Sequence, residues 1–169
     1  MLFRITRRAA TKLKISDGDL NAAPRVASAT EWYCNLTTVR RRQIFLFTQA
    51  ATLFSFWMPA AGVNRQNFGC AFRREATDVI KSYGFSESQV AKVLDDGPDA
   101  FGKSLDRGVI GSMVDFVKML SYVSDDDALF MSKTARELND IANRCPMSKL
   151  GMDYPIERLT VLLSSVGAA

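Results

Sequence analysis

The stretch WYCNLTTVRRRQIFLFT (residues 32–48) carries the clearest β signal in this chain. Its two halves, Trp32–Val39 and Gln43–Thr48, are rich in the aromatic and β-branched residues that favour strands, and Arg40-Arg41-Arg42 links them. A third such stretch, FSFWM (Phe54–Met58), follows after a short link and ends at Pro59. Together these stretches predict a hairpin that extends to a three-stranded antiparallel meander.

Two further stretches predict short strands. LFRIT (Leu2–Thr6) alternates in hydropathy, and AFGKSL (Ala100–Leu105) can form one more strand. Within the meander, Ile44–Phe47 is apolar at consecutive positions, which is typical of a central strand covered on both faces. We therefore expect the meander to hold the centre of the sheet and the two short strands to add edges to it.

From Phe68 onward the apolar residues recur every three or four positions, which is the period of helices. The predicted helices are one after a Thr6 cap, one from Phe68 to Tyr83 that Gly84 ends, one with a Ser86 capping box, one over Val109–Leu120, one capped by Ser124 and lined by Ala128 to Ala142, and one from Pro155. Strands early and helices late predict an α+β fold. In it, a small, mostly antiparallel sheet (the N-terminal strand plus the three-stranded meander) is packed on one side by about five helices.

The length of 169 residues suits one domain, spanning residues 1–169. Residues 16–30, SDGDLNAAPRVASAT, are rich in turn formers and lack an apolar period, so we predict a mobile loop there. The longest apolar run, Leu53–Ala61, is interrupted by Ser55 and Pro59 and falls short of the roughly 20 residues that cross a bilayer. The sequence therefore predicts a soluble protein without membrane contact.

The chain has three cysteines and no histidine. Cys34, Cys70 and Cys145 lie far apart, a spacing that fits neither a zinc cluster nor a disulfide framework and indicates buried free thiols in a reducing cytoplasm. Without histidine the chain lacks the commonest general base and metal ligand, and Ser-His or Cys-His nucleophilic pairs are excluded. Asp125–Asp127 resembles a metal cluster, but acidic residues in a first helical turn complement the helix dipole. We expect no metal and no cofactor.

The N-terminal residues 1–16, MLFRITRRAATKLKIS, are basic and precede the first acidic residue, Asp17. No apolar segment of about seven residues follows the charges, so a secretory signal is not predicted. A mitochondrial presequence and the short strand and helix described above are both compatible with this composition, and the latter is favoured. We therefore expect a cytoplasmic protein.

Charge divides the chain into two unlike halves. Residues 1–74 hold 12 Lys and Arg against 3 Asp and Glu, net +9, whereas residues 75–169 hold 10 against 15, net −5, and the sum is +4. These halves can form ordinary surface ion pairs with each other. Alternatively, the basic half attracts nucleic acid or an acidic partner.

Arg40, Arg41 and Arg42 are adjacent cations in a predicted hairpin turn, where they repel one another and gain nothing from packing. A hairpin tipped with arginines can lie along a phosphate backbone, and Arg7 and Arg8 of the first predicted helix add to the basic surface. The neighbouring aromatic residues Trp32 and Tyr33 either offer stacking surfaces to bases or belong to the core, and the core interpretation is favoured.

Two similar stretches, DRGVIGSM (106–113) and NRCPMSKL (143–150), each place an arginine beside a predicted helix end. Asp106 suits a helix cap, and Asn143 suits the left-handed residue that ends a helix. Arg107 and Arg144 are therefore candidate anion clamps for one phosphate or carboxylate. Alternatively, each arginine holds its loop by pairing with a local carboxylate. The candidate partners are Asp106, Asp115 and Asp153, and the candidate acid–base groups beside a clamped anion are Asp115, Asp153 and Tyr154.

Four segments in a fixed order resemble a family of small bacterial proteins known only as a domain of unknown function: EWYCNLTTVRRRQIFLFT, LFSF, RGVIGSMVDF and NRCPMSKLGMDYPIERL. The resemblance spans nearly the whole chain. It departs from the family pattern at Asp106 and Val114, where that family tends to have Asn. The resemblance implies a shared fold and a bacterial, cytoplasmic setting, and it implies no reaction.

Three functional hypotheses remain. The first is a non-catalytic binding or regulatory module whose basic N-terminal half contacts nucleic acid or an acidic partner. The second is an enzyme or sensor for a small phosphorylated or carboxylated ligand held by Arg107 and Arg144. The third is a protein–protein contact through an apolar patch or a dimer face. The lack of histidine and of a recognisable catalytic motif favours the first hypothesis over the second.

Overall fold

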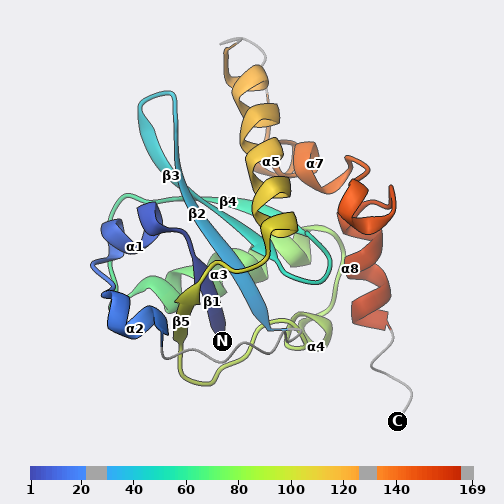
Figure 1. Cartoon of the computed structure of the whole chain (residues 1–169). Coiled ribbons are helices and arrows are strands. Elements are labelled where there is room, and N and C mark those ends of the chain that lie inside the picture. Colours follow the sequence, from blue (N-terminus) through green and yellow to red (C-terminus); the bar gives the residue numbers. More distant parts are fainter. Residues whose placement is uncertain (22–29, 126–132, 165–169) are drawn as a thin grey trace.

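The computed structural model describes residues 1–21, 30–125 and 133–164, and it places one sheet between two layers of helices (Figure 1). The strands are β1 (Leu2–Ile5), β2 (Glu31–Val39), β3 (Arg42–Gln49), β4 (Ser55–Pro59) and β5 (Ala100–Lys103). The helices are α1 (Arg7–Leu13), α2 (Asp17–Asn21), α3 (Phe68–Ser82), α4 (Glu87–Val90), α5 (Arg107–Asp125), α7 (Ala135–Asn143) and α8 (Pro155–Ser164), with a 3-10 turn η1 (Ser148–Leu150). The predicted α+β class is confirmed.

The sheet has the strand order β4-β3-β2-β1-β5 and contains both antiparallel and parallel pairs. The strands β2, β3 and β4 form the predicted antiparallel meander, in which Phe47 lies opposite Cys34 on one side and Phe56 on the other. The N-terminal strand β1 lies between β2 and β5 and is parallel to both, so it is an interior strand and not an edge. The helices α1 and α2 lie between β1 and β2 in the chain, and a helical crossover lets a chain re-enter a sheet in the same direction.

Helices cover both faces of the sheet, so the prediction of helices on one side is wrong. Figure 1 shows α3 behind the sheet and α5 in front of it. Because neighbouring residues of a strand point to opposite faces, Phe45 and Phe47 enter the core beneath α3, whereas Leu46 enters the core beneath α5. The run of consecutive apolar residues in β3 was the sequence signal for this second layer.

The larger core, beneath α3, is built around aromatic rings. The ring of Phe72 lies 4.9 Å from Phe3, 5.2 Å from Trp32 and 4.8 Å from Phe47, measured between ring centroids. Three strands thus converge on one helical side chain. These contacts anchor the base of the β2–β3 hairpin, whose far end extends beyond the rest of the sheet (Figure 1).

Local capping signals account for most helix starts. The side chain of Thr6 accepts a hydrogen bond from the Ala9 amide at the start of α1, and Ser86 and Gln89 form the predicted capping box of α4. The segment predicted as a loop over residues 16–30 contains α2, because Ser16 and Asp19 cap each other's backbone amides. Residues 22–29 of that predicted loop lie outside the described residues.

The prediction that Ser124 caps a separate helix is wrong. Helix α5 continues to Asp125, and the Ser124 hydroxyl donates to the carbonyl of Ser121 within it. The helix α7 begins after Thr134, which forms a capping box with Glu137. Residues 126–132, which include most of the predicted acidic first turn, lie outside the described residues.

All three cysteines are free thiols, as predicted, although only one of them is fully buried. Cys34 is buried, Cys70 is exposed and Cys145 is partly exposed. Burial raises the pKa of the Cys34 thiol well above its ordinary value. Within the described ranges, no helix is both long enough and apolar enough to span a membrane.

Candidate functional site

The β2–β3 hairpin turns through two arginines in an uncommon backbone conformation. Val39 lies opposite Arg42, so the turn consists of Arg40 and Arg41 alone, and the predicted three-residue link is one residue too long. Both turn residues have positive φ, 49° for Arg40 and 64° for Arg41. A two-residue turn of this kind favours Asn-Gly, because a side chain in the left-handed region costs about 1–2 kcal/mol per residue. All three arginines are exposed.

Helix α1 adds further positive charge beside this hairpin. The hydroxyl of Thr6 donates to the Asn35 side chain of β2 at 3.0 Å, and the Arg8 guanidinium donates to the Thr38 hydroxyl at 3.1 Å. These bonds hold the exposed basic face of α1 against the strand that leads into the turn. The structure therefore brings Arg8 close to the hairpin arginines, and Arg7 precedes it on the same helix.

A groove of about 1310 Å³ runs along the hairpin. Its cationic lining consists of Lys12, Arg40, Arg41 and Arg42, and its acidic lining of Glu75. Its apolar lining consists of Val39, Ile44, Trp57, Met58, Pro59, Ala61, Leu120, Ala135 and Leu138. Partial burial, together with the neighbouring Asp78, raises the pKa of the Glu75 carboxyl. The groove is thus positively charged at the hairpin tip and apolar at its base.

Trp32 and Tyr33 belong to the core, as the favoured interpretation predicted. Trp32 is fully buried, and its indole N–H donates to the Val93 carbonyl at 3.0 Å. The Tyr33 hydroxyl accepts from the Asp106 amide at 3.2 Å, and burial raises the pKa of this phenol. Neither ring offers a stacking surface. Trp57, which sequence reasoning did not single out, lines the groove and is partly exposed.

At the start of α5, a carboxylate of the chain itself occupies the helix N-terminus. Asp106 accepts hydrogen bonds from the amides of Gly108 (2.7 Å) and Val109 (3.2 Å), so the predicted cap is confirmed. Its other oxygen accepts from Lys149 at 2.8 Å, and this bond is the main cause of the lowered pKa of Asp106. Arg107 is exposed beside this cap. The amides that would favour an external anion are therefore already paired.

Arg144 lies at the end of α7 and pairs with Asp140 one turn earlier, at 3.3 Å. It therefore engages a local carboxylate, although not one of the three candidates predicted for it. Of those candidates, Asp153 pairs with Arg158 at 2.8 Å and Asp115 with Lys118 at 3.5 Å, while the nearby Tyr154 is exposed. That Arg107 and Arg144 share one anion stays a prediction.

Asn143 was predicted to end its helix in the left-handed region, and this prediction is wrong. It is the last residue of α7, is fully buried, and bonds the backbone of edge strand β4. Its side-chain oxygen accepts from the Ser55 amide at 2.7 Å, and its side-chain nitrogen donates to the Ser55 carbonyl at 2.8 Å. One turn earlier, Asn139 accepts from the Trp57 amide at 3.2 Å. Two asparagines at i and i+4 thus replace a neighbouring strand at this sheet edge.

The β4 edge is further connected to α3 through Tyr83. The Tyr83 hydroxyl donates to Asp140 at 2.7 Å and accepts from Asn143 at 3.3 Å, and burial raises the pKa of this phenol. The Arg136 guanidinium lies 5.0 Å from the centre of the Tyr83 ring. The sequence signal for this network was the spacing of Asn139 and Asn143 on the apolar face of a predicted helix.

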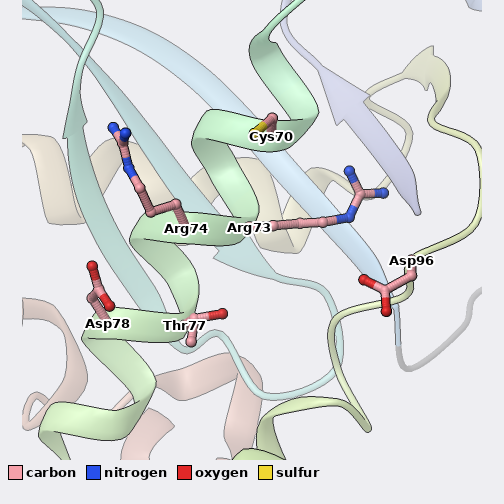
Figure 2. A pocket seen from close by; sticks show the side chains of 6 residues that line it. All are labelled: Cys70, Arg73, Arg74, Thr77, Asp78 and Asp96. Carbon is pink, nitrogen blue, oxygen red and sulfur yellow. The ribbon is translucent and has the colours of Figure 1, made fainter.

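A second hollow, of about 450 Å³, lies on the outer face of α3 (Figure 2). Figure 2 shows the side chains of Arg73 and Arg74 pointing away from each other. Arg73 is already bonded to Asp99 at 2.6 Å and to the Gly97 carbonyl at 3.0 Å. This hollow therefore does not bring two free cations together.

Among the described residues, no group of three acidic or cysteine side chains is placed to hold a metal ion.

The architecture defines an α+β protein with a mixed sheet between two helical layers and a basic, protruding hairpin. The chain belongs to the family described as Domain of unknown function (DUF6933), whose model matches residues 2–158. The predicted membership of an uncharacterised family is confirmed. Neither a curated protein nor a solved structure matches the chain.

Proposed function

We propose that this protein is a non-catalytic nucleic-acid-binding module and that its contact surface is the basic hairpin with the exposed face of α1. The observation that carries the proposal is the pair of left-handed arginines at the hairpin tip. Backbone strain in a residue that is not glycine persists where the surroundings or a function maintain it, and it gathers at ligand-binding positions. At this tip, three adjacent cations add electrostatic repulsion to the strain.

The charges around the hairpin support a polyanionic partner. Lys12 and the three hairpin arginines line one groove, and Glu75 is the acidic residue among the lining side chains. Within the described part of the chain, Arg41 and Arg42 form no ion pair, in contrast to Arg144. A row of exposed arginines on a protruding ribbon can follow a phosphate backbone and release its counterions. These features favour nucleic acid over a small anion, for which one compact pocket would suffice.

The test measures the binding of a fluorescein-labelled oligonucleotide by anisotropy over a series of salt concentrations. The test variant carries Arg40→Gln, Arg41→Gln and Arg42→Gln, and it keeps side chains of similar size at the strained turn. The control variant removes the same charge elsewhere, through Lys81→Gln, Lys103→Gln and Arg158→Gln. We expect the test variant to lose affinity about tenfold or more and its salt slope to fall by about two, because up to three phosphate contacts are lost.

Three outcomes would contradict the proposal. Wild-type protein fails to bind at low salt, or its binding does not depend on salt, or the control variant loses as much affinity as the test variant. A simpler observation comes from purification. If the proposal is correct, the ratio of absorbance at 260 to 280 nm falls when the purified protein is washed with concentrated salt, because bound nucleic acid is released.

A further inference from the structure

The groove along the hairpin is shaped for a chain-like ligand. Pro59 lies opposite Ile44, and the Ala60 amide donates to the Gln43 carbonyl at 3.0 Å. Nearer the tip, among the residues that the structure describes, the ribbon is paired only between β2 and β3 and has a free edge. The groove is lined from both faces of this ribbon, since Ile44 and Trp57 point to the α5 side while Gln43 and Met58 point to the α3 side. Its volume of about 1310 Å³ exceeds the range of roughly 300–1,000 Å³ for small-molecule pockets.

The two tryptophans of the chain differ in accessibility and in hydrogen bonding. Trp32 is fully buried and its indole N–H is paired with the Val93 carbonyl. Trp57 is partly exposed in the groove, and its indole N–H is buried and has no acceptor among the described residues. Because this N–H is shielded, a ligand in the groove meets the exposed part of the indole ring instead. Nucleobases have a flat face that stacks on aromatic side chains.

We infer that the groove binds a single-stranded nucleic acid, whose phosphates lie along Lys12 and the hairpin arginines and one of whose bases stacks on Trp57. This inference rests on the proposed function and specifies its ligand. Trp57 lies opposite Leu46, five residues along β3 from Arg41, which corresponds to about 17 Å of strand. Paired bases in a duplex keep their faces stacked inside the helix, so a duplex can contact the arginines but not the indole.

An acidic peptide is the other chain that positive charge could attract. It supplies carboxylates for the arginines, but it has no flat aromatic surface matched to Trp57 unless its sequence includes one. The combination of cations at the groove tip and a partly exposed indole at its base therefore favours a single strand over a peptide. The experiment therefore includes polyglutamate as an acidic peptide, so that the measurement distinguishes between the two kinds of partner.

The experiment uses the intrinsic fluorescence of the intact protein. Trp32 is enclosed in the core, so quenching by an added ligand reports on Trp57. The ligands are a 12-nucleotide oligothymidylate, an abasic oligonucleotide with the same number of phosphates, a duplex of equal length, and polyglutamate. We expect the oligothymidylate to quench emission and to bind Trp57→Ala about five- to 150-fold more weakly than wild type. Abasic strand and duplex should bind both proteins equally and leave the emission unchanged.

A conservative variant separates stacking from a structural role of Trp57. Trp57→Phe keeps an aromatic surface and should recover most of the affinity that Trp57→Ala loses. Should either variant fold poorly, protection of wild-type Trp57 from acrylamide quenching by bound oligothymidylate gives the same information. Protection is expected, and its absence overturns the inference.

The failure of this inference is distinguishable from that of the proposed function. If the duplex binds as tightly as the single strand and emission never changes, the single-strand inference is wrong, while the loss on replacing the hairpin arginines still supports nucleic-acid binding. If polyglutamate quenches more strongly and binds more tightly than any oligonucleotide, the partner is an acidic protein and both proposals are wrong.

Discussion

The hairpin tip and the β4 edge use polar residues in opposite ways. At the β4 edge, Asn143 meets both backbone groups of Ser55, and Arg144 is paired with Asp140. At the hairpin tip, Arg40 and Arg41 adopt left-handed backbone conformations beside a third arginine. Polar groups that satisfy one another within the fold contribute to stability, whereas strain and unbalanced charge are expected where an external ligand binds. We therefore expect substitutions at the β4 edge to change stability and substitutions at the hairpin to change binding.

The largest expected effect is on the β4 edge. Asn143→Ala leaves the buried amide and carbonyl of Ser55 without these partners, at about 1–3 kcal/mol for each unsatisfied group. We expect the free energy of unfolding in urea to fall by about 2–6 kcal/mol in total. Asn139→Ala loses one hydrogen bond, from the Trp57 amide, so its free energy of unfolding should fall by about half as much.

Two controls test this assignment. Arg144→Gln removes an exposed ion pair and should cost less than about 1 kcal/mol, which separates the buried asparagine from the surface charge beside it. Folded Asn143→Ala protein should bind oligonucleotide as wild type does. An unchanged urea midpoint for Asn143→Ala would show that the asparagine does not protect the sheet edge.

The second effect concerns the hairpin, where stability and binding should change in opposite directions. Replacing Arg40-Arg41 with Asn-Gly supplies the residues that a left-handed two-residue turn favours. We expect the unfolding free energy to rise by about 1–3 kcal/mol while oligonucleotide affinity falls. Urea denaturation and anisotropy on the same preparation measure both. A variant that is neither more stable nor weaker in binding contradicts the view that strain is retained here for function.

The sequence predicted the meander and most helices because their signals are local. Aromatic and β-branched runs, the Ser86 capping box and Pro155 at a helix start each depend on neighbouring residues alone. The position of β1 inside the sheet depends on contacts between distant segments, such as Leu2 with both Glu31 and Ala100. Periodicity carries no information about such pairings.

The candidate site was predictable in part for the same reason. Adjacent arginines between two strands mark a basic turn directly in the sequence, and the structure places α1 beside it. Trp57 gave no signal, because an aromatic residue in a strand suits the core as well as a groove. The role of Asn143 was missed because its partner, Ser55, lies 88 residues away in sequence. Recognising a sheet-edge cap requires knowing which strand is at the edge.

A smaller effect is expected at the start of α5, which tests the alternative of an anion clamp. Asp106→Ala removes the cap of Gly108 and Val109 and should cost about 1 kcal/mol. Because the hydrogen bond from Lys149 lowers the folded-state pKa of Asp106, the stabilisation by Asp106 is present above the ordinary pKa of 3.8. It is lost as the pH falls through the lowered value.

The anion clamp itself is tested with phosphate. Phosphate should raise the melting temperature of the wild-type protein no more than chloride does at equal ionic strength. A gain that Arg107→Gln and Arg144→Gln both remove would instead support the clamp.

The smallest effect comes from Glu75, the acidic residue lining the groove. Partial burial and Asp78 raise its pKa, so the folded protein takes up this proton at a higher pH than an ordinary glutamate with a pKa of 4.5. As the pH falls through the raised pKa, the groove loses a negative charge, and oligonucleotide affinity should rise about twofold, as expected for one solvent-screened charge. Glu75→Gln should reach that affinity at neutral pH and lose the pH dependence, whereas the distant Glu87→Gln should leave both unchanged. Equal responses of the two variants would mean that overall charge, and not charge within the groove, governs binding.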